Sequence, residues 1–161
     1  MIVVADASPL HYLTLIDAVN VLQPFYGRVL VPQTVALELQ NPNTPGRVRA
    51  WITQPPPWCQ IEADPKADPT LAFLDPGESA AIALALSILA DRLLIDDLAA
   101  RREAQRRQLQ VTGTVGVLAA AHRAQLLDLE KSLARLRTTS FRLHPDIVEQ
   151  VRAGLIEKDS S

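Results

Sequence analysis

The sequence predicts an α/β fold in which helices cover both faces of a parallel sheet. Short apolar runs alternate along the chain with longer segments that carry helix-start signals, and this alternation is typical of a parallel sheet. Hydrophobic residues make up 48% of the 161 residues, which is enough for one full hydrophobic core. Aromatic residues make up only 4%, so we expect a core of Leu, Val, Ile and Ala.

Five runs are expected to form strands. The first and the fourth are apolar throughout, which is typical of strands buried on both faces of a sheet. The others are placed by their apolar content and by the turn signals beside them. The expected strands are residues 2–5, 28–31, 58–62, 93–95 and 109–111.

Helix-start signals follow several of these strands. Ser8 and Pro9 suit the N-cap and first helical position of one helix. Asp75, Pro76 and Glu78 have the spacing of a capping box. Helices are expected from residue 9, at 32–39, 48–51, 79–90, from 96 or 97 to about 108, at 117–127, and as two short helices after 132 that separate near 144–145. We expect a single domain over 1–161, with a helical C-terminal extension at about 132–161.

Charge and cysteine content restrict the class of protein. The net charge of −2 is not that of a dedicated duplex-binding protein, although basic residues are concentrated between residues 98 and 142. Cys59 is the only cysteine, so no intramolecular disulfide is possible. The apolar run at 82–90 is shorter than the roughly 20 residues that cross a bilayer. We therefore expect a soluble, cytoplasmic protein that does not enter a membrane.

Acidic residues stand where two apolar strands end. Asp6 follows the first expected strand, and Asp96 and Asp97 follow the fourth. The carboxyl ends of parallel strands meet at one edge of a sheet, where ligands bind, and carboxylates gathered there suit a hard divalent cation. Two adjacent carboxylates at a buried strand end also repel each other unless a cation or an arginine neutralises them. The alternative is that each is only a helix-entry carboxylate.

Two glutamates are further candidates, each with a simple structural alternative. Glu38 lies in an expected helix, where an ordinary exposed glutamate is equally at home. Glu78 occupies the position of a capping-box glutamate. Ser8, Thr112 and Thr114 are hydroxyl residues at helix starts, and each is more typical of a cap than of a ligand.

Five segments together resemble the PIN-domain ribonucleases, the fold used by VapC-type toxins of toxin–antitoxin pairs. The similarity is greatest to a bacterial and archaeal branch of predicted nucleic-acid-binding PIN proteins of unknown function. The segments occur in the same order and with similar spacing. They are VADASPL at 4–10, VPQTVALEL at 31–39, LDPGESAAIALA at 74–85, LIDDLAAR at 94–101 and VTGTVGVL at 111–118.

The resemblance implies a three-layer α/β/α sandwich with a parallel sheet of four or five strands. It implies an acidic pocket that holds Mg²⁺ or Mn²⁺, with Ser8 and Thr112 beside it. The acids of this pocket would be Asp6, Glu38, Glu78 and Asp96 or Asp97. Two departures from the toxin pattern are visible, because Ile95 replaces the usual threonine of a T-x-D motif and Glu78 stands where aspartate is common.

The expected activity is metal-dependent hydrolysis of single-stranded RNA, with Asp6, Asp96, Asp97 and Glu78 around the metal. Arg101 or Arg102 would contact a flanking phosphate, since arginine suits bidentate contact. The resemblance further predicts an antitoxin partner and a homodimer. One alternative is a PIN-like protein that binds nucleic acid or a partner without cutting. A more remote alternative is a receiver-like α/β domain that binds Mg²⁺ at a phosphoacceptor site.

Overall fold

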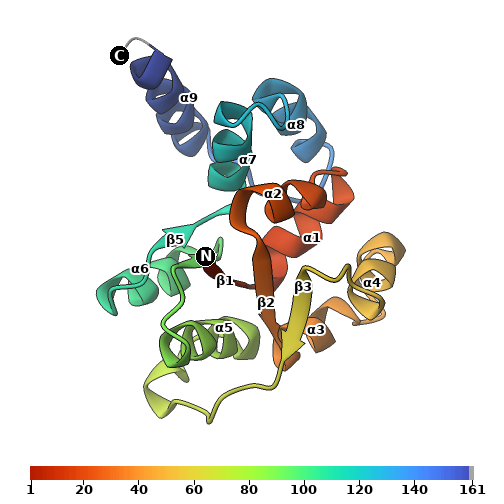
Figure 1. Cartoon of the computed structure of the whole chain (residues 1–161), viewed down its shortest axis with the longest axis vertical. Helices are drawn as coiled ribbons and strands as arrows, with labels where there is room; N and C mark the ends of the chain where they lie inside the picture. The colour runs from red at the N-terminus through yellow and green to blue at the C-terminus, as the bar shows by residue number, and fades with distance from the viewer. Residues whose placement is uncertain (160–161) are drawn as a thin grey trace.

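The computed structural model describes residues 1–159, and the side chains of residues 1–155 (Figure 1). The last two residues of the expected domain, 160 and 161, lie outside the described part of the chain. Among the described residues, no helix has both the length and the apolar character needed to span a bilayer.

A five-stranded parallel sheet forms the centre of the molecule. Its strands are β1 (Ile2–Ala5), β2 (Arg28–Pro32), β3 (Cys59–Glu62), β4 (Arg92–Leu94) and β5 (Val111–Thr112). They run in the order β3-β2-β1-β4-β5, and every pair is parallel. The predicted α/β class and strand number are therefore confirmed. A receiver-like domain has the order 2-1-3-4-5, so the observed order excludes the receiver-like alternative.

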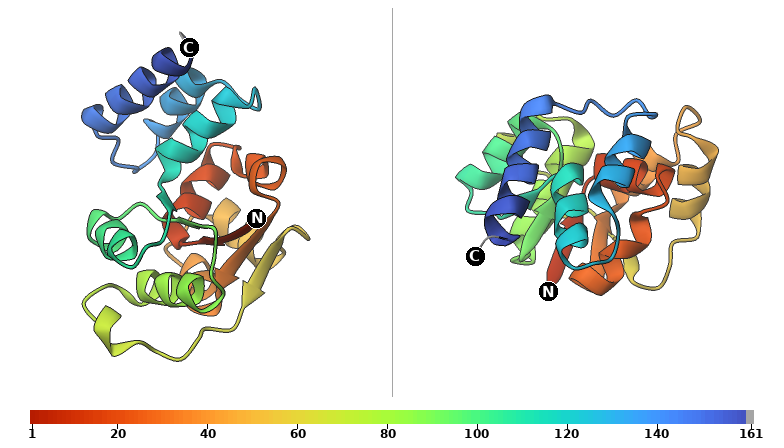
Figure 2. Two further views of the ribbon diagram at one scale, coloured as in Figure 1. Left: turned by 60° about the vertical axis from the view of Figure 1, so that its left-hand side comes forward. Right: turned by 90° about the horizontal axis from the view of Figure 1, so that it is seen from above.

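Helices connect the strands and continue beyond the last one. The α-helices are α1 (Ala7–Leu15), α2 (Leu22–Tyr26), α3 (Gln33–Leu39), α4 (Gly46–Thr53), α5 (Pro76–Ser87), α6 (Leu98–Arg106), α7 (Thr114–Arg123), α8 (Leu129–Leu136) and α9 (Pro145–Asp159). Short 3₁₀ turns lie at Val19–Val21 and Pro69–Leu71. Figures 1 and 2 both show α9 alongside α7, and contacts join these two helices.

Alternate residues of each central strand point to opposite faces of the sheet, as the pleat requires. Val3 and Ala5 belong to a core with α1, α3, α4, α7 and α8. Val4 belongs to a second core with α5 and α6. The two hydrophobic cores establish the predicted three-layer sandwich, with a helical layer on each face. Leucine, valine, isoleucine and alanine supply most of both cores, as the low aromatic content predicts.

Several element boundaries differ from the predicted ones. Helix α1 begins at Ala7, with Asp6 as its N-cap, so the prediction of Ser8 as N-cap is wrong. Pro9 is tolerated in the first turn because the backbone N–H groups there have no helical partner. Helix α7 begins at Thr114 rather than at 117, directly after the short strand β5. The predicted short last helix is wrong as well, since α9 has 15 residues.

Candidate functional site

The first two acids meet because their strands are neighbours. Strand β1 pairs with β4, and Ala5 lies opposite Leu94. The backbone N–H of Asp6 donates to the Leu94 carbonyl at 2.9 Å, which extends this pairing by one residue. Asp6 and Asp96 therefore leave the sheet at the same edge. They do so at the carboxyl ends of the two central strands, where α/β proteins place their ligands.

Asp6 is the most unusual residue of this edge. Its side chain is only 6% exposed, and its Oδ1 has no hydrogen-bond partner within the described chain. The pKa of Asp6 is raised from 3.8 to about 7, mainly by burial and also by the carboxylates of Asp75, Glu38 and Asp96, against a lowering by the Ala7 N–H. A buried carboxylate oxygen without a donor is costly. A cation beside it would remove that cost.

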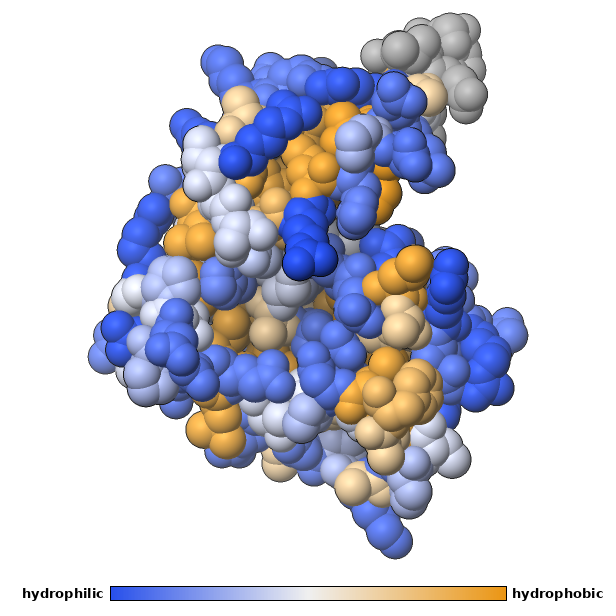
Figure 3. Space-filling view, turned by 180° about the vertical axis from the view of Figure 1, so that it is seen from behind, coloured by the Kyte–Doolittle hydropathy of each residue, from blue (hydrophilic) through white to orange (hydrophobic). Residues whose placement is uncertain are grey.

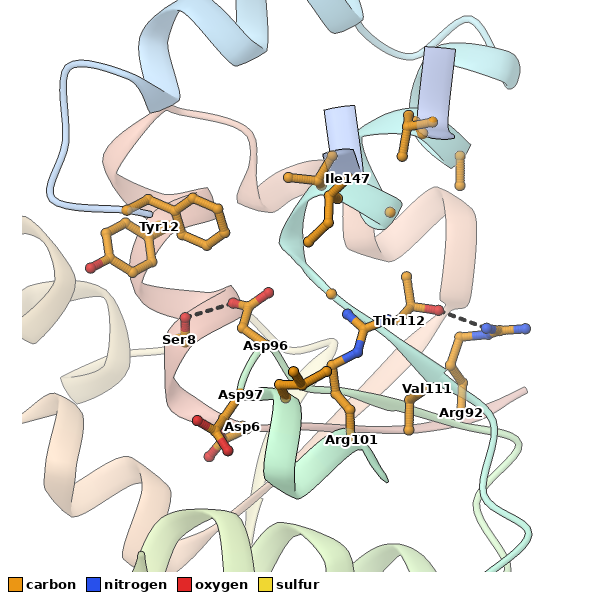
Figure 4. A pocket seen from close by; sticks show the side chains of 18 of the residues that line it. Asp6, Ser8, Tyr12, Arg92, Asp96, Asp97, Arg101, Val111, Thr112 and Ile147 are labelled. Carbon is orange, nitrogen blue, oxygen red and sulfur yellow. Dashed lines mark hydrogen bonds between the residues drawn. The ribbon is translucent and has the colours of Figure 1, made fainter. Parts of the chain in front are cut away.

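Asp96, in contrast, is held by three hydrogen bonds, of which Figure 4 shows the one from Ser8. The Ser8 hydroxyl donates to Oδ2 at 2.6 Å. Thr114 donates twice, from its backbone N–H to Oδ1 at 2.7 Å and from its hydroxyl to Oδ2 at 2.7 Å. Each carboxylate oxygen has about two lone-pair sites, so Oδ1 keeps one free. Asp96 is thus fixed in orientation and still able to accept a further partner.

The neighbouring Asp97 has a different role in the fold. It is the N-cap of α6, and its Oδ2 accepts the Ala100 N–H at 3.0 Å. It is exposed at the mouth of the site, where its charge helps to raise the pKa of Glu78. The adjacent pair therefore divides into an inner carboxylate, Asp96, and an outer capping carboxylate, Asp97.

Glu78 forms the predicted capping box with Asp75. The Glu78 N–H donates to Asp75 Oδ1 at 2.8 Å, and the Asp75 N–H donates to Glu78 Oε2 at 3.4 Å. Burial, followed by the charges of Asp75, Asp97 and Asp6, raises the pKa of Glu78 to about 8. The longer of the two bonds holds Glu78 weakly. Asp75, considered in the sequence only as an N-cap, thus adds another carboxylate to the cluster.

Glu38 reaches the same cluster across the start of α5. A Cβ built on Gly77 would lie 2.5 Å from both carboxylate oxygens of Glu38, so only glycine leaves room for this side chain. Burial raises the pKa of Glu38, and Asp75 raises it further, whereas the Gly77 N–H lowers it. The exposed-surface interpretation of Glu38 is therefore wrong, since the carboxylate packs against a helix N-terminus.

The residues predicted to support the acids are only partly in place. Ser8 contacts Asp96, but the Thr112 hydroxyl instead accepts from Arg92 Nη1 at 2.6 Å (Figure 4). Thr112 lines the cleft, as the resemblance implies, but the hydroxyl that contacts Asp96 belongs to Thr114, two residues further on. Thr112 is the last residue of β5 and Thr114 is the first residue of α7, so the change from strand to helix at Gly113 turns the two hydroxyls in different directions.

One of the two candidate arginines reaches the site. Arg101 lines the same cleft as the acids, and its Nη1 would lie 2.5 Å from a Cβ on Gly113. Glycine at this position therefore leaves space for the guanidinium beside Asp96. Arg102 is exposed and does not line the cleft. Helical spacing separates neighbours such as these by about 100° around the axis.

The acids form one end of a cleft of about 1320 Å³. Figure 3 shows it as a hollow below the C-terminal helix, with apolar surface on the upper wall. Its lining also includes Arg92, Arg123, Tyr12, Phe141 and Ile147. Among the described residues, no three carboxylate, imidazole or thiol groups converge closely enough to enclose a metal ion. The acids therefore gather without forming a closed cage.

The donor set nevertheless fits a hard divalent cation. Oxygen ligands are the ones that Mg²⁺ prefers, and this ion keeps several waters rather than requiring an all-protein cage. Asp6 supplies an unpartnered oxygen, and Asp96 supplies an oriented one. An arrangement in which every acid is only a helix cap does not account for Asp6, whose side chain makes no capping bond.

Comparison with known proteins assigns the family. A family model of the PIN domain matches residues 2–157. A PilT N-terminus domain protein from the hyperthermophilic archaeon Sulfolobus solfataricus has a similar fold, with a TM-score of 0.54 and 14% identity over 89% of this chain and 100% of that one. A comparison with curated proteins finds no match. PIN domains are generally nucleases. Because the family model covers nearly the whole sequence, the chain belongs to the PIN-domain family.

Proposed function

We propose that this protein is a metal-dependent endoribonuclease that hydrolyses single-stranded RNA. The observation that carries the proposal is the buried, unpartnered oxygen of Asp6 within a cluster of carboxylates. Carboxylates gathered in a buried site raise one another's pKa, so they ionise at neutral pH most readily beside a compensating partner. A divalent cation is the simplest such partner, and in a nuclease it lowers the pKa of a bound water and neutralises charge at the phosphate.

Each acid has a distinct part in this proposal. Asp6 and Asp96 would be the principal ligands of Mg²⁺ or Mn²⁺, because one has a free oxygen and the other a fixed orientation. Asp97 and Glu78 stand at the outer side and would complete the site directly or through water. Glu38, held against α5, would orient a water molecule or accept its proton. Ser8 and Thr114 keep Asp96 in place.

The cleft supports a single-stranded substrate. Its acidic end is followed by Arg101, and Arg92 and Arg123 line it further along. Guanidinium groups suit phosphate oxygens. The protein as a whole has a net charge of −2, which does not provide the broad basic surface of a duplex-binding protein. Single strands, in contrast, fit a groove that combines basic and aromatic side chains.

A binding protein without catalytic activity is the second candidate. The absence of three converging ligand groups among the described residues favours it. The toxin role, the antitoxin partner and the homodimer stay predictions that rest on the family resemblance.

The test is cleavage of a mixed pool of single-stranded RNA in Mg²⁺, Mn²⁺ or EDTA. Wild-type protein is compared with Asp6→Asn and with a matched control, Asp17→Asn, which changes an exposed aspartate paired with Arg47. We expect metal-dependent cleavage by the wild type and the control, and none by Asp6→Asn. Metal and RNA binding by a folded wild type that cuts no RNA would support the binding-only alternative.

A second comparison tests the arginine assignment. Arg101→Met is expected to raise KM for RNA about 10-fold or more, which corresponds to a charge-assisted hydrogen bond of about 1.5–3 kcal/mol. Arg102→Met removes the same charge from the adjacent, exposed position and is expected to leave KM unchanged. Equal effects of the two substitutions would show that only overall charge matters.

A further inference from the structure

An aromatic pair forms part of the cleft wall. Tyr12 of α1 and Phe141, which follows α8, both line the cleft. Their ring centroids are 5.0 Å apart with an interplanar angle of 75°, an edge-to-face arrangement. The Tyr12 hydroxyl lies 2.9 Å from the Ser140 hydroxyl. This wall therefore joins the first helix to the segment before α9.

The wall lies next to the acidic cluster. Ser8 and Tyr12 are four residues apart on α1, so they occupy the same face of the helix, one turn apart. Ser8 donates to Asp96, and Figure 4 shows Tyr12 beside that hydrogen bond, on the opposite side of the acids from Arg101. A chain of nucleotides that passes the acids thus meets basic groups on one side and aromatic rings on the other.

Packing explains only part of this aromatic pair. Both side chains pack against the first hydrophobic core, and both remain partly exposed where they face the cleft. The tryptophans provide a useful contrast. The rings of Trp51 and Trp58 also lie close together, at 5.9 Å, but these residues do not line the cleft. Phe25 and Tyr26 do line the cleft, but they precede β2 and so lie at the amino ends of the parallel strands, away from the acids at the carboxyl ends. Of these aromatic residues, Tyr12 and Phe141 are therefore the pair beside the acids.

We propose that Tyr12 and Phe141 form a nucleobase subsite, on which an unpaired base next to the reactive phosphate stacks. This inference rests on the proposed function and specifies its substrate as a strand with an accessible base at this position. Base–aromatic stacking is tolerant of sequence because every base has a π-face. Purines, which have the larger face, would bind more tightly than pyrimidines. A base paired within a duplex could not reach the rings.

Binding to a catalytically disabled protein provides the first test. The probe is a ten-nucleotide oligouridine RNA with a single 2-aminopurine, and the protein is Asp6→Asn. Stacking on an aromatic ring quenches 2-aminopurine fluorescence. We expect quenching by the Asp6→Asn protein and also by the double variant that carries both Asp6→Asn and Tyr12→Phe. We expect Asp6→Asn with Tyr12→Leu to lose the quenching and to bind about 10-fold more weakly, within the range measured for base stacking.

Two controls separate stacking from structural damage. Phe73→Leu makes a similar change at an exposed ring outside the cleft, and it should leave quenching and affinity unchanged. If Tyr12→Leu does not fold by circular dichroism, Phe141→Leu removes the other ring. Replacing the 2-aminopurine nucleotide with an abasic one needs no protein variant. The abasic nucleotide should weaken binding to the Asp6→Asn protein about 10-fold. In the double variant with Tyr12→Leu, which already lacks the ring, the abasic nucleotide should weaken binding by little.

The outcomes distinguish this subsite from the nuclease activity. Quenching that depends on Tyr12, in a protein whose wild type cuts no RNA, would support the subsite and refute the proposed nuclease. Equal quenching and affinity in the Tyr12→Leu, Tyr12→Phe and Phe73→Leu proteins would overturn the subsite, whether or not the wild type cleaves RNA. Cleavage that is insensitive to an abasic nucleotide at every position near the cut would overturn it as well.

Discussion

Replacing Asp6 with asparagine should stabilise the metal-free protein while it removes metal binding. The change keeps the shape of the side chain and removes its charge. Asp6 is buried, lacks a partner for Oδ1 within the described chain, and faces other carboxylates. A site built in this way favours function over stability, because the same charge that attracts a cation is unfavourable without one.

The size and pH dependence follow from the pKa of Asp6. The rise from 3.8 to about 7 corresponds to about 4 kcal/mol, at about 1.36 kcal/mol per pKa unit. The buried amide of asparagine still lacks partners, which costs about 1–3 kcal/mol, so we expect a net gain of about 2 kcal/mol at pH 8.5. The folded wild type holds its proton up to a higher pH than the unfolded chain does. Its stability therefore falls as the pH rises from about 4 through 7, and the advantage of Asp6→Asn shrinks towards pH 4.

Urea unfolding at pH 5 and pH 8.5, with EDTA or with Mn²⁺, measures these effects. Without metal, Asp6→Asn should have the higher midpoint at pH 8.5 and little or no advantage at pH 5, where the gain of about 1.6 kcal/mol is offset by the cost of the buried amide. Mn²⁺ should stabilise the wild type by about 2.7 kcal/mol at 100 times its dissociation constant and should not stabilise Asp6→Asn. Asp17→Asn again serves as the exposed control. A metal-free Asp6→Asn protein that is no more stable than wild type at pH 8.5 would refute this reasoning.

Three further substitutions test how the acids are held. Gly77→Ala places a Cβ 2.5 Å from the Glu38 carboxylate oxygens, so Glu38 must move. We expect RNA cleavage to fall about 100-fold, because a misplacement of about 1 Å can have an effect of that size. Circular dichroism should show that the variant still folds. Thr114→Val removes the hydroxyl bond to Asp96 and is expected to lower the free energy of unfolding by about 1 kcal/mol and to weaken Mn²⁺ binding in a calorimetric titration. Thr112→Val removes a bond to another part of the cleft, and Mn²⁺ affinity equal to that of wild type is expected in the same titration.

The sequence predicts the positions of the central acids because sheet geometry leaves little freedom there. Asp6 and Asp96 each follow an apolar strand, and the ends of neighbouring parallel strands must meet. Burial of Asp6 follows in the same way, since the residues before it form the centre of the sheet. Local sequence therefore carries most of the information that brings these two carboxylates together.

Other parts of the site depend on contacts that local sequence does not specify. Thr112 and Thr114 are both hydroxyl residues near one helix start, and only the end point of β5 decides which of them faces Asp96. Tyr12 forms the cleft wall together with Phe141, which is 129 positions away in the sequence. Neither distinction is visible in hydrophobic periodicity, because both depend on how distant segments pack.

Capping and ligation, which the sequence presents as alternatives for Glu78, act together in this fold. Backbone N–H groups at the start of α5 donate to three carboxylates. The Glu78 N–H donates to Asp75, the Asp75 N–H to Glu78, and the Gly77 N–H to Glu38. A helix N-terminus favours negative charge, so it partly offsets the repulsion among these acids in the metal-free protein. The long bond from the Asp75 N–H to Glu78 is the weakest of these contacts. Glu78 is therefore the capping carboxylate that can turn towards a cation at the least cost, while Asp75 keeps α5 capped.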